Sequence, residues 1–110
     1  MYAEKVTENL PKFDESGLLI DSAMWNEAVA QLIAVDNGIA SLTEDHWRII
    51  RALRAHCAKY GVPPAMSLLC RKQGMDLNCV QKLFCTCLNA WRVAGLTDPG
   101  EEAKSYLSAM

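Results

Sequence analysis

The clearest element in the pattern of apolar and polar positions is a helix over residues 43–60. Thr43 is a favoured N-cap, and Gly61 with the two prolines that closely follow it ends the helix. The apolar residues recur every three or four positions, so one face of this helix is expected to be buried. The residues expected on that face are Trp47, Ile50, Leu53, Cys57 and Tyr60.

The same spacing predicts helices on both sides of this one. Before it, a helix capped by Asp21 or Ser22 is expected to end at Gly38, with an apolar face made of Trp25, Ala28, Val29, Leu32 and Ile33. After it, residues 64–74 predict a short helix with Met66, Leu69 and Cys70 inward. Residues 77–94 are then expected to form one continuous helix that buries Val80, Leu83, Phe84, Cys87, Leu88 and Trp91.

The two ends of the chain carry less regular patterns. Residues 10–21, LPKFDESGLLID, place apolar flanks around a polar turn in which Gly17 supplies a positive φ, and they predict a small β-hairpin. Residues 1–9 have no period and are expected to be loose, whereas a cap, a proline and acidic residues predict a helical tail in residues 97–110. The expected fold class is α+β, mainly α, with a single domain over residues 1–110.

Length and charge narrow the class of protein. The chain has 110 residues, 51% of them hydrophobic, which is enough for one core and too little for two. Its net charge of −2 provides no general attraction to nucleic acid or to an anionic membrane. The N-terminal residues are polar and acidic, unlike a signal peptide, and no apolar run is long enough to span a membrane. We therefore expect a soluble, cytoplasmic protein with no membrane partner.

Five cysteines, at positions 57, 70, 79, 85 and 87, are the main candidates for chemistry. Because their number is odd and no export signal is visible, reduced thiols are expected. No C-x-x-C pair occurs, and the two histidines lie upstream of most of the cysteines. The sequence therefore indicates neither a metal site nor a cofactor.

Helical geometry separates the individual thiols. On a continuous helix Cys87 faces the core, whereas Cys85 lies about 200° away from it around the axis and points to the boundary or to solvent. Cys79 would be the third residue of a helix capped by Asp76, where the helix dipole favours a thiolate and the nearby carboxylate opposes it. Cys79 and Cys85 are therefore candidate reactive thiols, with a structural role as the alternative, and Cys70 is expected in the core.

A row of basic side chains marks one side of the helix over residues 43–60. The row consists of Arg48, Arg51, Arg54, His56 and Lys59. Together with the turn at residues 61–64 and the next short helix, it could form a helix-turn-helix-like surface for nucleic acid. A solvated helix face is the simpler interpretation, and the acidic balance of the chain argues against nucleic acid as the partner.

Three motifs resemble the DsrC/TusE family, which comprises the gamma-type partner of dissimilatory sulfite reductase and a sulfur-relay protein of tRNA thiolation. The motifs are D-x-x-G-L-L before a tryptophan in residues 14–25, L-x-x-x-H-W followed by R-x-x-R in residues 42–54, and P-A at residues 64–65. With the later LF and VAGL, the similarity covers residues 10–96. It implies a DsrC-like fold, a small β-hairpin followed by a compact orthogonal helical bundle, and a role in sulfur metabolism.

The resemblance does not extend to the family's thiols. Its members hold sulfur on a cysteine at the penultimate position of a flexible C-terminal arm, and DsrC proper adds a second cysteine just before the I/V-A-G-L motif. Trp91 occupies that second position here, and the tail after Leu96, TDPGEEAKSYLSAM, contains no cysteine. The family's glycine- or proline-containing break after LF is also missing, which favours a continuous helix.

These observations leave three hypotheses. The first is a non-catalytic docking or regulatory protein of a sulfur-relay or sulfite-reductase system, with protein partners and no enzymatic activity of its own. The second is a persulfide sulfur carrier that uses Cys79 or Cys85 as the acceptor. The third is a DNA-binding regulator that uses the basic helix over residues 43–60.

Overall fold

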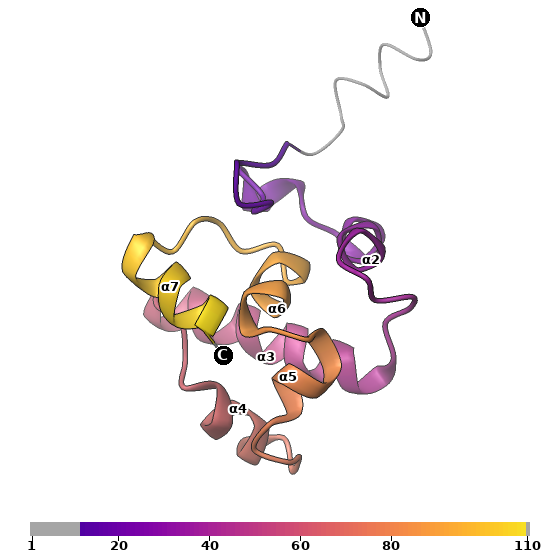
Figure 1. Ribbon diagram of the computed structural model, residues 1–110, viewed down its shortest axis with the longest axis vertical. Coiled ribbons are helices and arrows are strands. Elements are labelled where there is room, and N and C mark those ends of the chain that lie inside the picture. Colours follow the sequence, from indigo (N-terminus) through magenta and orange to yellow (C-terminus); the bar gives the residue numbers. More distant parts are fainter. Residues whose placement is uncertain (1–11, 110) are drawn as a thin grey trace, which may run out of the picture.

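The computed structural model describes residues 12–109, so the prediction for residues 1–9 lies outside the described residues. Within this range the chain forms a short 3-10 helix followed by six α-helices (Figure 1). In chain order these are η1 (Ser22–Met24), α2 (Glu27–Asp36), α3 (Glu44–Tyr60), α4 (Met66–Lys72), α5 (Cys79–Phe84), α6 (Cys87–Val93) and α7 (Glu101–Ala109).

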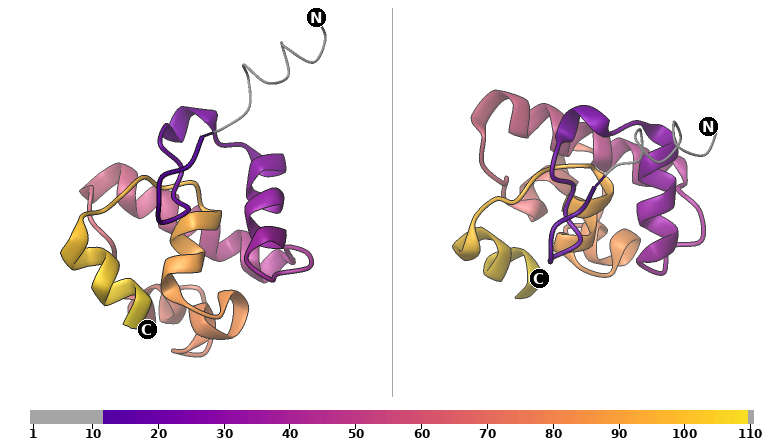
Figure 2. Two further views of the ribbon diagram at one scale, coloured as in Figure 1. Left: turned by 45° about the horizontal axis from the view of Figure 1, so that its top comes forward. Right: turned by 90° about the horizontal axis from the view of Figure 1, so that it is seen from above.

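Helix α6 is the centre of the packing. It contacts α2, α3, α5 and α7, and the two views of Figure 2 show α2 and α7 on opposite sides of it. Five of its seven residues are buried. The core around α6 takes fully buried side chains from the other helices, among them Ile49, Ile50, Leu53, Phe84 and Leu107. A short helix can be this central because its apolar residues cover most of its circumference.

The predicted N-terminal β-hairpin is wrong, and with it the α+β class. Residues 12–109 contain no strand, and Phe13 and Leu19 form only an isolated antiparallel bridge. Gly17 does adopt the expected positive φ, +79°. The polar turn was thus recognised, but its flanks pair only at this bridge, through backbone hydrogen bonds from Asp14 to Leu18 and from Ile20 to Lys12. The described part of the molecule is helical.

Side-chain hydrogen bonds explain why this segment turns without forming a ladder. Asp14 Oδ1 accepts from the N–H groups of Ser16 and Leu18, at 2.8 and 3.0 Å, and this winds the backbone tightly around the carboxylate. Asp21 then caps η1 through a hydrogen bond from the N–H of Ala23. The chain therefore enters a helix directly after the bridge, and Leu18 and Leu19 are both buried in the domain.

The expected ends of α3 are confirmed, and its buried face differs from the prediction. Thr43 caps the helix and Gly61, with φ +74°, ends it. The buried side chains are His46, Ile49, Ile50 and Leu53. From residue 55 onward no side chain of α3 is buried, and Tyr60 is 58% exposed. The apolar pattern continues beyond the point at which α3 leaves the core.

Helix α2 begins later than expected, because Asp21 caps η1 and Asn26 caps α2. The residues of α2 that are buried are Val29, Ala30, Ile33 and Ala34. Leu32, predicted on that face, is 64% exposed. Helices α4 and α7 form where the pattern placed them. Among residues 12–109, each helix is too short or too polar to cross a membrane.

Candidate functional site

Cys85 lies at a break between two helices. Because α5 ends at Phe84 and α6 begins at Cys87, the predicted continuous helix over residues 77–94 is wrong. Cys85 has φ +73° and ψ −47°, and its N–H donates to the Gln81 carbonyl at 2.9 Å. Of the free cysteines in residues 12–109, Cys85 is the exposed one. The structure therefore places one of the two candidate thiols in contact with solvent.

Polar side chains replace the helical hydrogen bonds that the break interrupts. Thr86 caps α6 by accepting the N–H of Asn89 at 3.1 Å, and the Asn89 side chain donates to the Phe84 carbonyl at 2.9 Å. The apolar residues keep their helical spacing across the break, so the hydrophobic pattern contains no sign of it. Thr86 was the available signal, since threonine is favoured as an N-cap and disfavoured inside a helix.

Cys87 and Trp91 face the core, as predicted. Cys87 has no exposed surface and Trp91 is 4% exposed. Burial raises the pKa of the Cys87 thiol, because the thiolate loses its hydration there. Burial likewise raises the pKa of the half-buried Cys57, although the nearby Arg54 opposes the shift. Reactive cysteines are exposed and have a stabilised thiolate. Neither Cys57 nor Cys87 has both properties.

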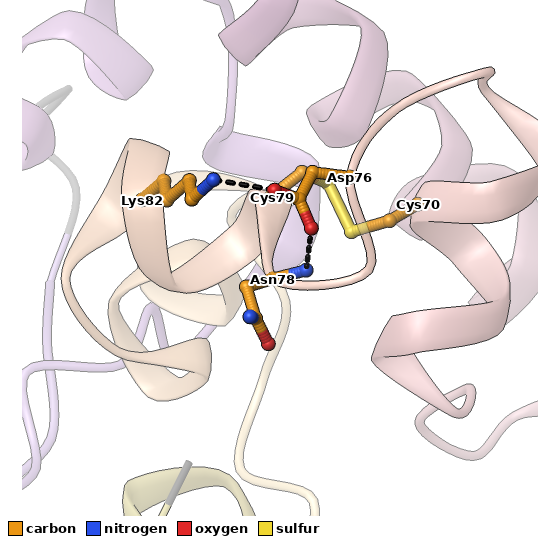
Figure 3. Close-up of a disulfide and its surroundings, with 5 residues drawn as sticks. All are labelled: Cys70, Asp76, Asn78, Cys79 and Lys82. Atoms are coloured by element: carbon orange, nitrogen blue, oxygen red, sulfur yellow. Dashed lines mark hydrogen bonds and ion pairs between the residues drawn. A yellow bond between two sulfur atoms is a disulfide. The ribbon is translucent and has the colours of Figure 1, made fainter.

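Cys79 is paired, contrary to the expectation of reduced thiols. It forms a disulfide with Cys70, shown in Figure 3, and both side chains are buried. Cys79 is also the first residue of α5, behind Asn78, so the expected third position after Asp76 is wrong. In the described range no three His, Cys, Asp or Glu side chains gather where they could hold a metal ion.

The segment after α6 folds back onto that helix. The indole Nε1 of Trp91 donates to the Thr97 carbonyl at 2.8 Å, directly before the tail. Further along, Leu107 of α7 is fully buried in the main core. The position that holds a cysteine in the resembling family therefore holds an indole that fastens the start of the tail.

Lys104 fastens the same tail at its middle. Its Nζ lies 3.2 Å from Asp98 Oδ2 and 3.4 Å from Ser16 Oγ, so it links α7 to the N-terminal turn. The N–H of Gly100 and the Lys104 ammonium both donate to Asp98, and together they lower the pKa of that carboxyl. The hydrogen bond to Asp98 in turn raises the pKa of Lys104.

The residues of the predicted basic row have different surroundings. Arg48 and Arg51 are exposed, with the Arg51 guanidinium 5.9 Å from the centre of the Trp47 ring. Lys59 lies over the Tyr60 ring at 5.3 Å, in the last turn of α3. Arg54 turns inward instead and is half-buried. The cations are thus divided between solvent, aromatic neighbours and the domain interior.

Arg54 belongs to a junction that joins three distant segments of the chain. Its guanidinium lies 4.0 Å from the centre of the Trp25 ring and donates to the Ala94 carbonyl at 2.7 Å. Trp25 Nε1 donates to the Val93 carbonyl at 2.9 Å. A Cβ on Gly95 would lie 2.0 Å from Trp25 Cδ1, so only glycine fits beneath the indole. Burial lowers the pKa of Arg54. The tryptophan, R-x-x-R and VAGL motifs therefore meet at one structural contact.

His46 joins α3 to the end of α5. The N–H of Thr43 donates to His46 Nδ1 at 3.0 Å, so the neutral ring carries its proton on Nε2 and donates it to the Leu83 carbonyl at 2.8 Å. The ring also meets Phe84 edge-on, with centroids 5.0 Å apart. The histidine of the H-W motif is therefore a buried structural residue, a role that the apolar pattern missed.

An open groove of about 650 Å³ lies between the N-terminal turn and α2. Arg92 reaches it from α6, and donates to the Ser16 carbonyl at 2.8 Å and to Asn89 Oδ1 at 2.7 Å. The groove combines an apolar wall with charged side chains. It is lined by Phe13, Glu15, Ser16, Gly17, Val29, Leu32, Ile33, Asp36, Asn37 and Arg92.

Comparison with known proteins identifies related chains. The family model described as DsrC like protein matches residues 5–101. The sulfurtransferase TusE of Pectobacterium atrosepticum is 41% identical over 56 residues, which are 51% of this chain and 50% of the relative. The chain thus spans about half the length of the curated relatives it matches.

Solved structures match over a longer range. The oxidized gamma-subunit of dissimilatory sulfite reductase (DsrC) from Archaeoglobus fulgidus is 36% identical, with a TM-score of 0.71 over 83% of this chain and 90% of that one. The DsrC/gamma subunit from Pyrobaculum aerophilum is 28% identical, with a TM-score of 0.72 over 83% and 85% of the two chains. The chain belongs to the DsrC-like protein family.

Proposed function

We propose that this chain is a non-catalytic docking or regulatory member of a sulfur-relay or sulfite-reductase system, acting in the cytoplasm through protein partners. Membership of the DsrC-like family supports the assignment to sulfur metabolism. Its relatives include a sulfurtransferase and a gamma subunit of dissimilatory sulfite reductase, and a subunit works by contacting other chains. The proposal keeps the contact with a partner and omits the transfer of sulfur.

The observation that carries the proposal is the folded tail. A sulfur-carrying arm has to leave its own domain to bring a thiol to a partner. Here the tail is held by the Trp91 hydrogen bond, by Lys104 and by the buried Leu107, so it can leave only after local unfolding. Residues 88–110 contain no cysteine. The chain therefore keeps a surface for contact with a partner and has no thiol on its tail to carry sulfur.

The groove beside α2 supports a contact with a protein partner. Leu32 lines it and is 64% exposed, and Phe13 on the opposite side is 43% exposed. Exposed apolar side chains that converge on a groove are typical of a recognition surface. Val35 offers a matched control, because it lies on the same helix and is 57% exposed but does not line the groove.

A reconstituted sulfur relay tests the docking role. A cysteine desulfurase passes sulfur through relay proteins to a TusE-type protein and its acceptor, and the chain is added in excess. We expect it to slow transfer to the acceptor, while mass spectrometry finds no added sulfur on any of its cysteines. Leu32→Glu should weaken the inhibition and Val35→Glu should not. The docking role is excluded if the wild-type chain binds no component and leaves the transfer rate unchanged.

A persulfide carrier that uses Cys85 is the second candidate, and the break between α5 and α6 favours it. The break leaves the Cys85 thiol exposed on a backbone that no longer follows the helix. Cys79 is available for this role only after its disulfide is reduced. In the same assay a carrier would gain one sulfur atom and pass it on. That signal should disappear in Cys85→Ser and persist in Cys57→Ser, the control at a half-buried free thiol.

A further inference from the structure

The disulfide joins two consecutive helices beneath an exposed connection. Cys70 lies near the end of α4 and Cys79 opens α5, with their Cα atoms 5.8 Å apart (Figure 3). Both side chains are buried, at 0% and 4% exposure, while most of residues 71–78 lie on the surface. The two buried side chains thus close a short loop whose residues lie mostly on the surface.

Few polar side-chain contacts hold the beginning of α5, although Val80 in its first turn is fully buried. Asn78, the residue before the helix, makes no side-chain cap. Asp76 accepts the N–H of Asn78 at 3.2 Å and pairs with Lys82, as Figure 3 shows. Both side chains of that ion pair are more than half exposed, and such pairs contribute little to stability. The disulfide is therefore the covalent link at this end of α5.

The far end of α5 leads directly to the exposed thiol. Leu83 receives the His46 hydrogen bond, Phe84 is fully buried, and Cys85 follows at the break. Helix α5 has six residues, too few to be stable without its neighbours. We therefore expect breaking the disulfide at Cys79 to destabilise the whole helix, including the backbone that positions Cys85.

We propose that Cys70 and Cys79 form a redox-reversible clamp, whose state sets how often α5 and the Cys85 break open. In reducing compartments, protein disulfides are usually transient and serve redox sensing or catalysis. The interpretation of this disulfide as reversible in the cell rests on the cytoplasmic location proposed above. The reacting partner is a low-molecular-weight thiol such as glutathione, or the dithiol of an oxidoreductase.

The exchange balances as two successive thiol–disulfide steps. One protein thiolate attacks an oxidised disulfide RSSR, forms a mixed disulfide and releases RS⁻, which takes up the proton lost by that protein thiol. The second protein thiolate attacks the protein sulfur of the mixed disulfide, forms the Cys70–Cys79 bond and releases the second RS⁻, which is protonated likewise. Two electrons pass from the protein to RSSR, yielding two RSH, and reduction is the reverse.

The size of the effect follows from the length of the closed loop. Cys70 and Cys79 are nine residues apart. For a closed loop of that length, the chain-entropy relation gives a stabilisation that lowers the equilibrium constant for opening on the order of 80-fold. Local opening of α5 releases part of this chain entropy. We therefore expect its amides to exchange about 10- to 80-fold faster in the dithiol form than in the disulfide form.

Hydrogen exchange read by mass spectrometry on the full chain tests the clamp. Oxidised and reduced protein, and the Cys70→Ala and Cys79→Ala variants, are compared for peptides covering α5 and Cys85. We expect faster exchange there in the reduced wild type, while the wild-type interior of α3 changes little. Each variant should show the fast pattern under both conditions. Cys57→Ala is the control, because it removes a free thiol and should leave the difference intact.

A titration with mixtures of reduced and oxidised glutathione completes the test, with alkylation and mass spectrometry reporting the fraction of disulfide. We expect one reversible transition that involves Cys70 and Cys79 alone. The proposal is overturned if the pair stays reduced, or stays oxidised, across all mixtures, or if α5 exchanges equally fast in both forms. Because no sulfur-relay component is present, failure here leaves the docking role untouched.

Discussion

Replacing Gly95 with alanine tests the junction that joins the family motifs. Gly95 follows α6 with φ +72°, and the Trp25 indole lies directly over its Cα. An added Cβ would lie 2.0 Å from Trp25 Cδ1, 2.4 Å from Cγ and 2.8 Å from Cβ. These distances are too short for non-bonded carbon atoms, so the indole must move.

Two costs add in this variant. A side chain in the left-handed backbone region costs about 1–2 kcal/mol. Displacing the indole breaks its hydrogen bond to the Val93 carbonyl, about 0.5–1.5 kcal/mol, and its contact with Arg54, about 0.5–2 kcal/mol. We therefore expect Gly95→Ala to lower the free energy of unfolding by about 2–5.5 kcal/mol, a large share of the stability of a domain of this size.

Urea unfolding followed by far-ultraviolet circular dichroism measures this loss. Gly74→Ala is the matched control, because Gly74 also has φ +72° but has no atom within 4 Å of its added Cβ. The Gly74→Ala variant should lose only the cost of a side chain in the left-handed backbone region, about 1–2 kcal/mol. In a Trp25→Ala background, which removes the ring contacts and keeps only the Cβ contact at 2.8 Å, Gly95→Ala should cost less than in the wild type. Equal losses for Gly74→Ala and Gly95→Ala, or no relief in the Trp25→Ala background, would refute the reasoning.

Three further predictions concern charged and titrating groups. Arg54→Ala should cost about 2–3 kcal/mol in urea unfolding and Arg54→Lys less, whereas a loss below about 0.5 kcal/mol in both would show that the junction does not need the guanidinium. Burial raises the pKa of Cys87, so its contribution to stability is complete below about pH 8.5 and is lost as the pH rises through the folded value. Stability measured against pH should therefore fall less at alkaline pH in Cys87→Ala than in the wild type. The pKa of Asp98 is lowered, so its contribution is complete above about pH 4 and is lost as the pH falls. The protection of the α7 amides, measured relative to their intrinsic exchange rate at each pH, should fall in acid, and Asp98→Asn should remove that dependence.

The sequence was most informative where helix ends carry strong chemical signals. Thr43 and Gly61 marked α3 correctly, since an N-cap hydroxyl and a left-handed glycine satisfy the backbone groups that a helix leaves unpaired. The acidic residues after Pro99 indicated α7, which begins at Glu101, two residues later than a cap at Asp98 implied. The inward positions of Cys87 and Trp91 followed from spacing alone, and the structure confirms them.

The errors arose where side-chain hydrogen bonds or distant contacts decide the structure. The break at Cys85 depends on Thr86 and Asn89, which the apolar period does not register. The N-terminal turn depends on the Asp14 carboxylate, which competes with strand pairing.

Distant contacts account for the remaining differences. The pairing of Cys70 with Cys79 requires the relative placement of α4 and α5, which no local pattern contains. The inward turn of Arg54 likewise requires Trp25 and Ala94, which lie far from it in the chain.

The most direct test of the account is amide hydrogen exchange in α7, measured by nuclear magnetic resonance on the full chain. The proposed function requires the tail to be part of the folded domain, held by Trp91, Lys104 and Leu107. We predict that amides near Lys104 and Leu107 exchange at least about 100-fold more slowly than in an unfolded chain. Exchange of these amides at the unfolded rate, while the interior of α3 remains protected, would contradict the account and reveal a free arm.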